Sequence, residues 1–166
     1  MRFLKIAVVT GAAVMLAACG GGDKPAESTD AAAPAMDAPA MDAPAAGAAQ
    51  AITGTMHEVK MLINADQAYV YEPAEITVKQ GDGIKFVMVS GGPHNVAFDG
   101  TLLPADVKTQ LLANMPNQAA ELMGPMMLSE GEDYTISFAG IAPGTYEYFC
   151  TPHLAMGMRA KVTVTQ

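Results

Sequence analysis

The chain has 166 residues, enough for one ordinary domain with further sequence outside it. Tryptophan is absent, and methionine is frequent, with 13 residues. The formal charge of -8 at pH 7 argues against nucleic acid as a partner and favours a basic or neutral protein surface.

The N-terminus has the layout of a secretory signal. Arg2 and Lys5 precede an apolar run that ends in small residues just before Cys19. The run is too short for a membrane-spanning helix. Its end, LAACG, resembles the bacterial lipobox, which implies cleavage before Cys19 and attachment of lipid to its sulfur. We therefore expect residues 1–18 to be a lipoprotein signal peptide, the alternative being an ordinary signal peptide that is cleaved elsewhere.

Residues 19–50 comprise Cys19, the expected lipidation site, and the low-complexity segment that follows it, with a short Ala-Pro-Ala-Met-Asp repeat. The segment lacks regularly spaced bulky apolar residues that could be buried together. Burial therefore cannot offset the entropy cost of ordering the segment. We expect it to be a disordered tether. The protein would then be exported and lipid-anchored on the periplasmic side of a bacterial membrane, and Gly20 beside Cys19 favours the outer membrane.

From residue 51 to residue 166 the pattern changes to short alternating apolar runs, separated by Gly and Pro turn signals. A period of two is typical of strands with one buried face. The alternating positions are Val59, Met61 and Ile63; Ile76 and Val78; Ile84, Phe86 and Met88; Tyr134, Ile136 and Phe138; Tyr146 and Tyr148; and Val162 and Val164. The pattern predicts one all-β domain, a β-sandwich of about seven or eight strands.

One segment departs from this period. In LPADVKTQLLA, residues 103–113, the apolar Val107, Leu111 and Leu112 recur at helical spacing. We expect a short helix there, in a long crossover between strands.

Soft metal ligands are concentrated near the C-terminus, in CTPHLAMGM, residues 150–158. Cys150 and the two methionines offer soft sulfur donors, His153 offers an intermediate one, and the motif has no carboxylate. This set favours copper in both Cu(I) and Cu(II) states. Three alternatives are a structural zinc site, which would need more Cys and His ligands; a catalytic Cys–His pair, which leaves the methionines unexplained; and a buried cysteine without any metal.

A second histidine is expected to complete the site. His94 follows the apolar run 84–89 and a Gly-Gly-Pro turn, so it is placed to project from one end of the sandwich, where strand pairing can bring it beside Cys150. Two histidines and a cysteine with a weak axial methionine are the donor set of an electron-transfer copper site. His57 lies in the first predicted strand, outside any motif, and we interpret it as a non-ligand.

The segments FVMVSGGPHNVAFD and PGTYEYFCTPHLAMGMRAKVTV resemble the two copper-binding segments of plastocyanins and amicyanins, the small blue-copper cupredoxins. The resemblance covers residues 59–166 and implies an eight-stranded Greek-key cupredoxin β-sandwich that holds a single type 1 copper, cycling between Cu(II) and Cu(I). By the match, His94, Cys150 and His153 take the three strong ligand positions.

The axial methionine has two candidates. The amicyanin spacing C-x2-H-x2-M selects Met156, and the plastocyanin spacing C-x2-H-x4-M selects Met158. Both groups place this methionine three residues before a Lys-Val pair, which here is Lys161-Val162. We therefore predict that Met158 is the axial ligand.

The resemblance also implies roles for residues around the ligands. Asn95 is expected to link the two ligand loops and to reach the cysteine sulfur, and Pro152 has no N–H to donate to the thiolate. In the family the ring edge of the downstream histidine ligand reaches the surface. Here Pro93, Leu154 and Ala155 surround that position, and we expect these three residues to form an electron exit patch.

The sequence thus predicts a membrane-tethered type 1 blue copper protein that carries single electrons between redox complexes. It is not expected to be an enzyme, since a site filled by four protein ligands has no open position for substrate. The expected partners are redox proteins such as c-type cytochromes, oxidases or photosynthetic complexes. The protein itself is expected to be a monomer. The alternative is a periplasmic lipoprotein that sequesters or delivers copper, assisted by the methionines between Met115 and Met127.

Overall fold

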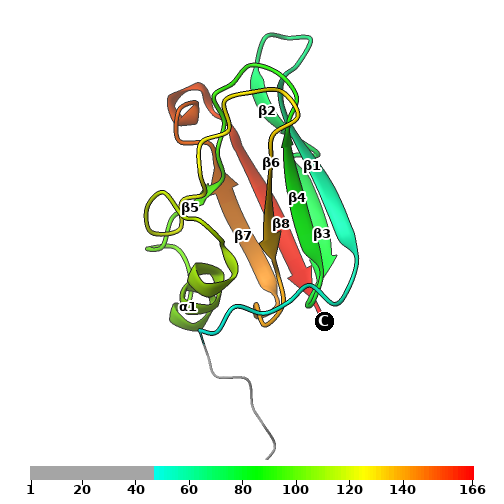
Figure 1. The fold of residues 1–166 in the computed structure, drawn as a ribbon, viewed down its shortest axis with the longest axis vertical. Coiled ribbons are helices and arrows are strands. Elements are labelled where there is room, and N and C mark those ends of the chain that lie inside the picture. The colour runs from blue at the N-terminus through cyan, green and yellow to red at the C-terminus, as the bar shows by residue number, and fades with distance from the viewer. Residues whose placement is uncertain (1–46) are drawn as a thin grey trace, which may run out of the picture. The chain divides into compact units, whose positions relative to one another are not determined.

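The structure, a computed structural model, describes residues 47–166 (Figure 1). Cys19, the predicted signal peptide and all but the last residues of the predicted tether lie outside the described residues. Within residues 47–166 no helix is long and apolar enough to cross a membrane.

The described residues form eight strands in two sheets that pack face to face. One sheet contains β1 (Met56–Ile63), β2 (Tyr69–Glu72), β4 (Gly83–Met88) and β6 (Asp133–Ser137), in the order β2-β1-β4-β6. The other contains β3 (Glu75–Lys79), β5 (Ala97–Phe98), β7 (Gly144–Phe149) and β8 (Arg159–Thr165), in the order β3-β8-β7-β5. The pairs β1–β4 and β3–β8 are parallel, and the other pairs are antiparallel. The predicted all-β sandwich is confirmed.

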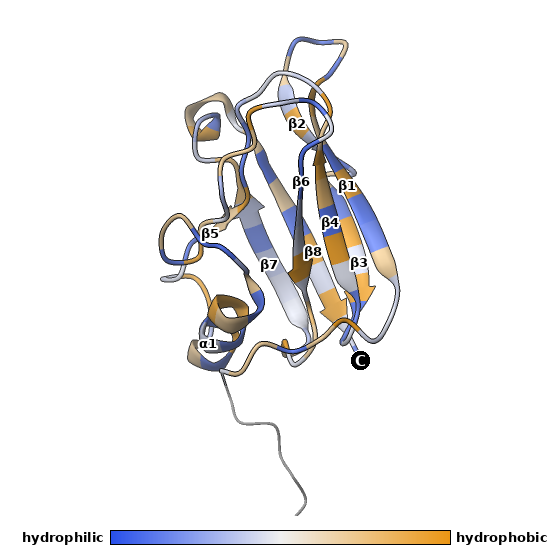
Figure 2. Cartoon of the chain, viewed as in Figure 1, coloured by the Kyte–Doolittle hydropathy of each residue, from blue (hydrophilic) through white to orange (hydrophobic). Residues whose placement is uncertain are grey.

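The alternating apolar positions of the sequence line the space between the sheets. All of them are buried except Ile63 and Ile76, which are partly buried. Figure 2 shows the result as bands of opposite hydropathy along several of the strands. Burial of these side chains, worth about 1.5–3 kcal/mol for each large one, fixes the register, because a slip by one residue would expose a whole face.

The predicted helix is present as α1 (Ala105–Asn114), which begins two residues later than the apolar spacing indicated. Pro104 stands just before it in an extended conformation, with φ -54° and ψ 147°, so the helix begins after this proline. Val107 and Leu111 are buried against the sandwich. The Asn114 side-chain amide donates to the carbonyl oxygens of Ser137 and Ala139, at 2.9 and 2.8 Å, and so fixes the helix to the end of β6.

Residues 47–50, which we call the strap, lie against α1. The backbone N–H of Gln50 donates to Oδ1 of Asn114 at 2.9 Å, and Nε2 of Gln110 donates to the carbonyl of Ala48 at 2.8 Å. Gln110 and Asn114 are themselves buried, so these polar side chains are satisfied by the strap and by each other. Figure 1 shows α1 and the beginning of the strap at one end of the sandwich, and the 3₁₀ turn η1 (Leu154–Met156) at the other.

Asp82, at the turn between β3 and β4, accepts three hydrogen bonds. Its carboxylate accepts from the backbone N–H of Thr55 at 2.7 Å, from that of Lys79 at 2.9 Å, and lies 2.9 Å from Nε2 of His57. The bond from Lys79 and then the one from His57 lower the pKa of Asp82 to about 2. His57 is therefore engaged by a carboxylate at the start of β1.

Candidate metal centre

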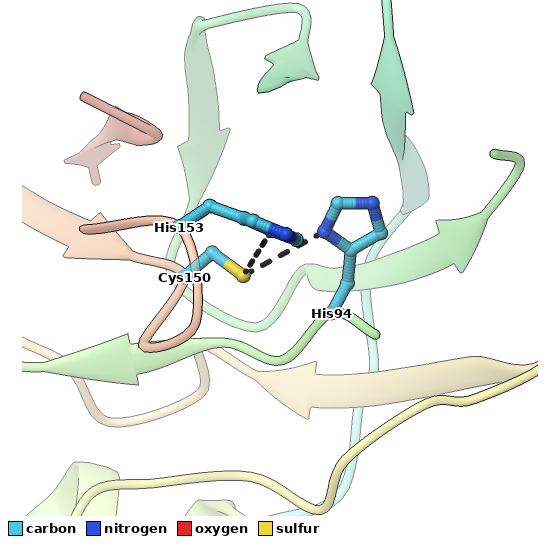
Figure 3. A group of neighbouring side chains, drawn as sticks. All are labelled: His94, Cys150 and His153. Atoms are coloured by element: carbon cyan, nitrogen blue, oxygen red, sulfur yellow. Dashed lines mark hydrogen bonds between the residues drawn. The ribbon is translucent and has the colours of Figure 1, made fainter. Parts of the chain in front are cut away.

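His94, Cys150 and His153 meet at one end of the sandwich (Figure 3). Cys150 directly follows β7, and His153 begins the turn η1. His94 comes three residues before β5, whose Ala97 pairs with Phe149 of β7, so strand pairing brings the two chain segments together. The ligand atoms of the three side chains all lie within 4.8 Å of one another. No other group of three His, Cys, Asp or Glu side chains within residues 47–166 is placed to share an ion.

The cysteine sulfur lies between the two imidazoles. Sγ of Cys150 is 3.6 Å from Nδ1 of His94 and 3.5 Å from Nδ1 of His153. All three side chains are buried, and His153, the most accessible of them, is only 5% exposed. Buried polar groups that converge in this way, with no carboxylate among them, form a soft donor set that fits copper.

A backbone carbonyl selects the tautomer of His94. Nε2 of this ring lies 2.9 Å from the carbonyl oxygen of Ser90, which can only accept, so Nε2 carries the proton and Nδ1 is left as a free donor for a metal. Burial lowers the pKa of His94, and the bond to Ser90 opposes that change. Burial, followed by the nearby His94, also lowers the pKa of His153. Both rings are therefore held in the neutral form that binds metals.

The Cys150 thiol is held in an environment that opposes ionisation in the absence of a cation. Burial raises the pKa of Cys150, and backbone hydrogen bonds from Asn95 and His153 act in the other direction. A metal that binds here must displace the thiol proton, which makes its affinity depend on pH.

Asn95 joins the two loops that carry the ligands. Its side-chain oxygen accepts from the backbone N–H of Thr151 at 2.8 Å, and its Nδ2 donates to Oγ1 of Thr151 at 3.2 Å. The carbonyl of Asn95 accepts in turn from the Tyr71 hydroxyl at 2.7 Å. These bonds hold the residue after His94 against the residue after Cys150 and so fix the two ligand loops relative to each other.

The chain matches the family of copper binding proteins described as the plastocyanin/azurin family, over residues 57–165. It belongs to this family. A cupredoxin domain of this kind takes copper as its cofactor, and the group of His94, Cys150 and His153 fits one type 1 site.

Plastocyanins are among the relatives of this cupredoxin. It is 40% identical over 100 residues to a chloroplastic plastocyanin of Physcomitrium patens, covering 60% of this chain and 53% of the relative. It is 36% identical over 120 residues to a chloroplastic plastocyanin of Tetradesmus obliquus, covering 72% and 74%. A mutant fern plastocyanin, solved in oxidised and reduced forms, superposes with a TM-score of 0.52 at 25% identity, covering 65% of this chain and 99% of the fern protein.

The two candidate axial methionines of this cupredoxin differ sharply in burial. Met158 is fully buried, its N–H donates to the carbonyl of His153 at 3.2 Å, and its carbonyl accepts from the N–H of Cys150 at 3.1 Å. Met156 lies in η1 and is 56% exposed. Burial and the hydrogen bonds to two ligand residues favour Met158, and the axial role stays a prediction.

The electron exit patch predicted from sequence lies on the loops that carry the ligands. Pro93 and Ala155 are exposed, and Leu154 is partly buried. Pro152, expected to limit hydrogen bonding to the sulfur, is also partly buried. The ring of Tyr69, which sequence reasoning missed, stacks on His153, with centroids 3.8 Å apart and planes 15° apart. No motif marks this tyrosine, because it comes from β2, far from both ligand segments.

Two further exposed apolar side chains lie beside the site: Met126, which the sequence indicated only as one of the methionines that would assist copper delivery, and Leu128, which it did not indicate. Met127 exchanges two backbone hydrogen bonds with His94, at 3.0 and 2.8 Å. Its neighbours Met126 and Leu128 are 41% and 69% exposed, and so extend the apolar surface next to the predicted exit patch. Met115 and Met127 themselves belong to the hydrophobic core, which is the usual use of methionine in an irregular segment.

Proposed function

We propose that this cupredoxin is a membrane-tethered carrier of single electrons between larger redox complexes. Bound copper would supply a one-electron couple between Cu(II) and Cu(I). The observation that carries the proposal is the converging group of His94, Cys150 and His153, which is buried and brought together by strand pairing. An electron carrier needs fixed ligands, because electron transfer is faster when the side chains move little between the two oxidation states.

The residues of the site hold the donors rather than open a place for substrate. Ser90 orients the His94 ring, and Asn95 ties the His94 loop to the Cys150 loop. Buried Met158 is proposed to close the fourth position. With two imidazoles, a thiolate and a thioether in place, no position is left for a reacting ligand, and we therefore propose a function in electron transfer rather than catalysis.

The surface around the site is suited to close contact with a partner. Neither residues 90–95 nor residues 150–158 contain a charged side chain. A partner that approaches these loops would not have to desolvate ions, and the exposed apolar Pro93 and Ala155 would be buried by it. We propose c-type cytochromes, oxidases or photosynthetic complexes as the partners, with the cupredoxin acting as a monomer.

Tethering is proposed from the sequence alone. The LAACG segment, which ends at Gly20, supports cleavage and lipid attachment at Cys19. The low-complexity residues that follow would let the copper domain range over the periplasmic face of the membrane, and the outer membrane is the proposed one.

Spectroscopy of the copper-loaded protein tests the site. We expect intense visible absorption from thiolate-to-copper charge transfer and a narrow copper hyperfine splitting in the EPR spectrum. Weak absorption with an ordinary hyperfine splitting would contradict the proposal. Stopped-flow oxidation of the reduced protein by a c-type cytochrome then tests the carrier role.

The alternative function is copper delivery. It is favoured by two exposed thioethers near the site, those of Met126 and Met156, and the same preparation tests it. A carrier retains copper through repeated redox cycles, whereas a delivery protein releases Cu(I) to an acceptor. Mixing the reduced protein with a Cu(I) chelator of moderate affinity distinguishes the two. Rapid transfer combined with slow oxidation by the cytochrome would favour delivery.

A further inference from the structure

The stack between Tyr69 and His153 joins the two sheets across the metal centre. Tyr69 is the first residue of β2, in one sheet, while His153 follows β7 of the other sheet. Their ring centroids are 3.8 Å apart and the planes are inclined by 15°, so the two rings lie nearly face to face. Tyr69 also meets the His94 ring edge-on, at 6.2 Å and 66°. One tyrosine therefore contacts both predicted imidazole ligands.

The backbone around Tyr69 holds its ring in this position. Tyr69 pairs with Ile63 of β1, and the His94 loop packs against both residues at Gly91. Gly91 has φ +75°, and a Cβ there would lie 2.4 Å from Cγ1 of Ile63 and 3.3 Å from Cε1 of Tyr69. Only glycine fits this close approach, so the backbone of the His94 loop lies directly against Ile63 and the edge of the Tyr69 ring.

The two imidazoles are oriented by different means. His94 is fixed by the bond from Nε2 to the Ser90 carbonyl. Within residues 47–166 the structure gives Nε2 of His153 no comparable carbonyl, and the contact of this ring with the sulfur is through Nδ1. What covers the flat face of the His153 ring is Tyr69.

We propose that Tyr69 is a positioning residue for the metal centre: it holds the His153 imidazole in the orientation that binds metal. The ring stays in place in the copper-free protein and in both oxidation states, which reduces the rearrangement that accompanies each electron transfer. The part of this inference that concerns the copper-free protein is independent of the proposed function, and the part that concerns the redox states rests on it.

The expected size of the effect follows from the energy of aromatic pairs. Removing one such contact corresponds to about a 2- to 12-fold change in an equilibrium constant. We therefore expect Tyr69→Leu to release copper about 2- to 12-fold faster than the wild type, since the freed ring dissociates more readily. Tyr69→Phe keeps the ring and should behave as the wild type does.

The copper-free protein gives the first test. Nuclear Overhauser contacts between the Tyr69 and His153 rings, and relaxation of isotope-labelled histidine, report the position and mobility of the ring. We expect direct contacts and an ordered His153 ring in the wild type and in Tyr69→Phe, and a mobile ring in Tyr69→Leu. Wild-type protein without ring contacts would overturn the inference without any variant, even if Tyr69→Leu failed to fold.

The copper-loaded protein gives the second test, with Tyr146→Leu as the matched control. Tyr146 is a buried tyrosine on β7 whose hydroxyl donates to the Ala142 carbonyl, so its loss lowers general stability away from the ligands. Tyr69→Leu should change copper release, the reduction potential and the electron self-exchange rate, and Tyr146→Leu should change none of them. Equal copper release and equal potential in Tyr69→Leu and the wild type would overturn the inference, whereas a wild type without blue absorption would overturn only the proposed function.

Discussion

Nδ1 of His94 lies 3.6 Å from Sγ of Cys150, although 56 residues separate the two in the chain. The pairing of β5 with β7 and the bonds between Asn95 and Thr151 create this proximity. Both causes lie in the polypeptide, so the fold itself places these two side chains next to each other.

Cys150→Ser should abolish the intense visible absorption of the copper-loaded protein, because a hydroxyl is a poor soft donor and cannot give thiolate charge transfer. Absorption spectra of the two proteins at equal copper content make the comparison. Circular dichroism serves as the control for folding. A serine variant that stays intensely coloured would refute the assignment of the ligand.

Met158→Leu should keep the colour but shift the reduction potential, since an axial ligand tunes the site without creating it. Met156→Leu is the matched control, because this methionine is 56% exposed whereas Met158 is buried. Cyclic voltammetry of both variants measures the shift. If only Met156→Leu shifts the reduction potential, Met156 is the axial ligand and the shorter C-x2-H-x2-M spacing is the correct one.

Leu154→Glu should slow electron transfer to a partner strongly while the copper spectrum is almost unchanged. The new carboxylate would have to be desolvated at the apolar contact next to His153. Charge removal at Glu130, which is exposed outside the ligand loops, should instead alter mainly association and its dependence on salt. Stopped-flow oxidation by a c-type cytochrome measures both, and a wild-type rate for Leu154→Glu would place the exit elsewhere.

Asp82 should make the copper-free domain sensitive to acid. Its pKa is lowered to about 2 from an ordinary 3.8, so its contribution to folding is complete above the higher value and is lost as the pH falls through the lower one. Asp82→Asn should reduce the free energy of unfolding at neutral pH by about 1.5–3 kcal/mol, the usual range for hydrogen bonds to a charged group.

Urea unfolding of the two copper-free proteins at pH 7 and near pH 2 measures this contribution. The difference between wild type and Asp82→Asn should be large at the first pH and small at the second. His57→Gln, which removes the second of the two largest causes of the lowered pKa, should have a smaller effect than Asp82→Asn. A difference that is the same at both pH values would show that the charge of Asp82 does not contribute.

Cys19→Ser should move the protein from the membrane fraction to the soluble fraction and leave the copper spectrum unchanged. The reason is that the proposed lipid is attached to this sulfur, whereas the predicted copper ligands all lie after residue 90. Immunoblots of fractionated cells make the measurement. Retention of the variant in the membrane would mean that the attachment lies at another residue.

Sequence periodicity predicted the core of this fold because the strands that alternate are those with one face in the interior. β2 was not identified from that pattern. It is a four-residue edge strand whose Tyr-Val-Tyr sequence has no polar residue between the aromatic ones. The start of α1 was placed too early, since Leu103 continues the apolar spacing but Pro104 adopts an extended conformation.

The ligands could be predicted from sequence because their chemistry is concentrated in two short motifs. The structure brings His94, Cys150 and His153 together, and their role as ligands stays a prediction. Tyr69 was not found, because its contact with His153 arises from the packing of one sheet on the other, which leaves no local pattern. The burial of Gln110 and Asn114 was equally hidden. Amides on a helix ordinarily face water, and these two do not because they bond to the strap, to each other and, for Asn114, to the carbonyls at the end of β6.

The strap determines how a mechanical load would enter this domain. A pull on residue 47 is resisted first by the hydrogen bonds to Gln110 and Asn114, and then by the two bonds from Asn114 to the end of β6. The ligand loops lie at the other end of the long axis and are not in the path of this force. A pull on the chain from its N-terminal side therefore acts first on the strap and α1, away from the three donor atoms.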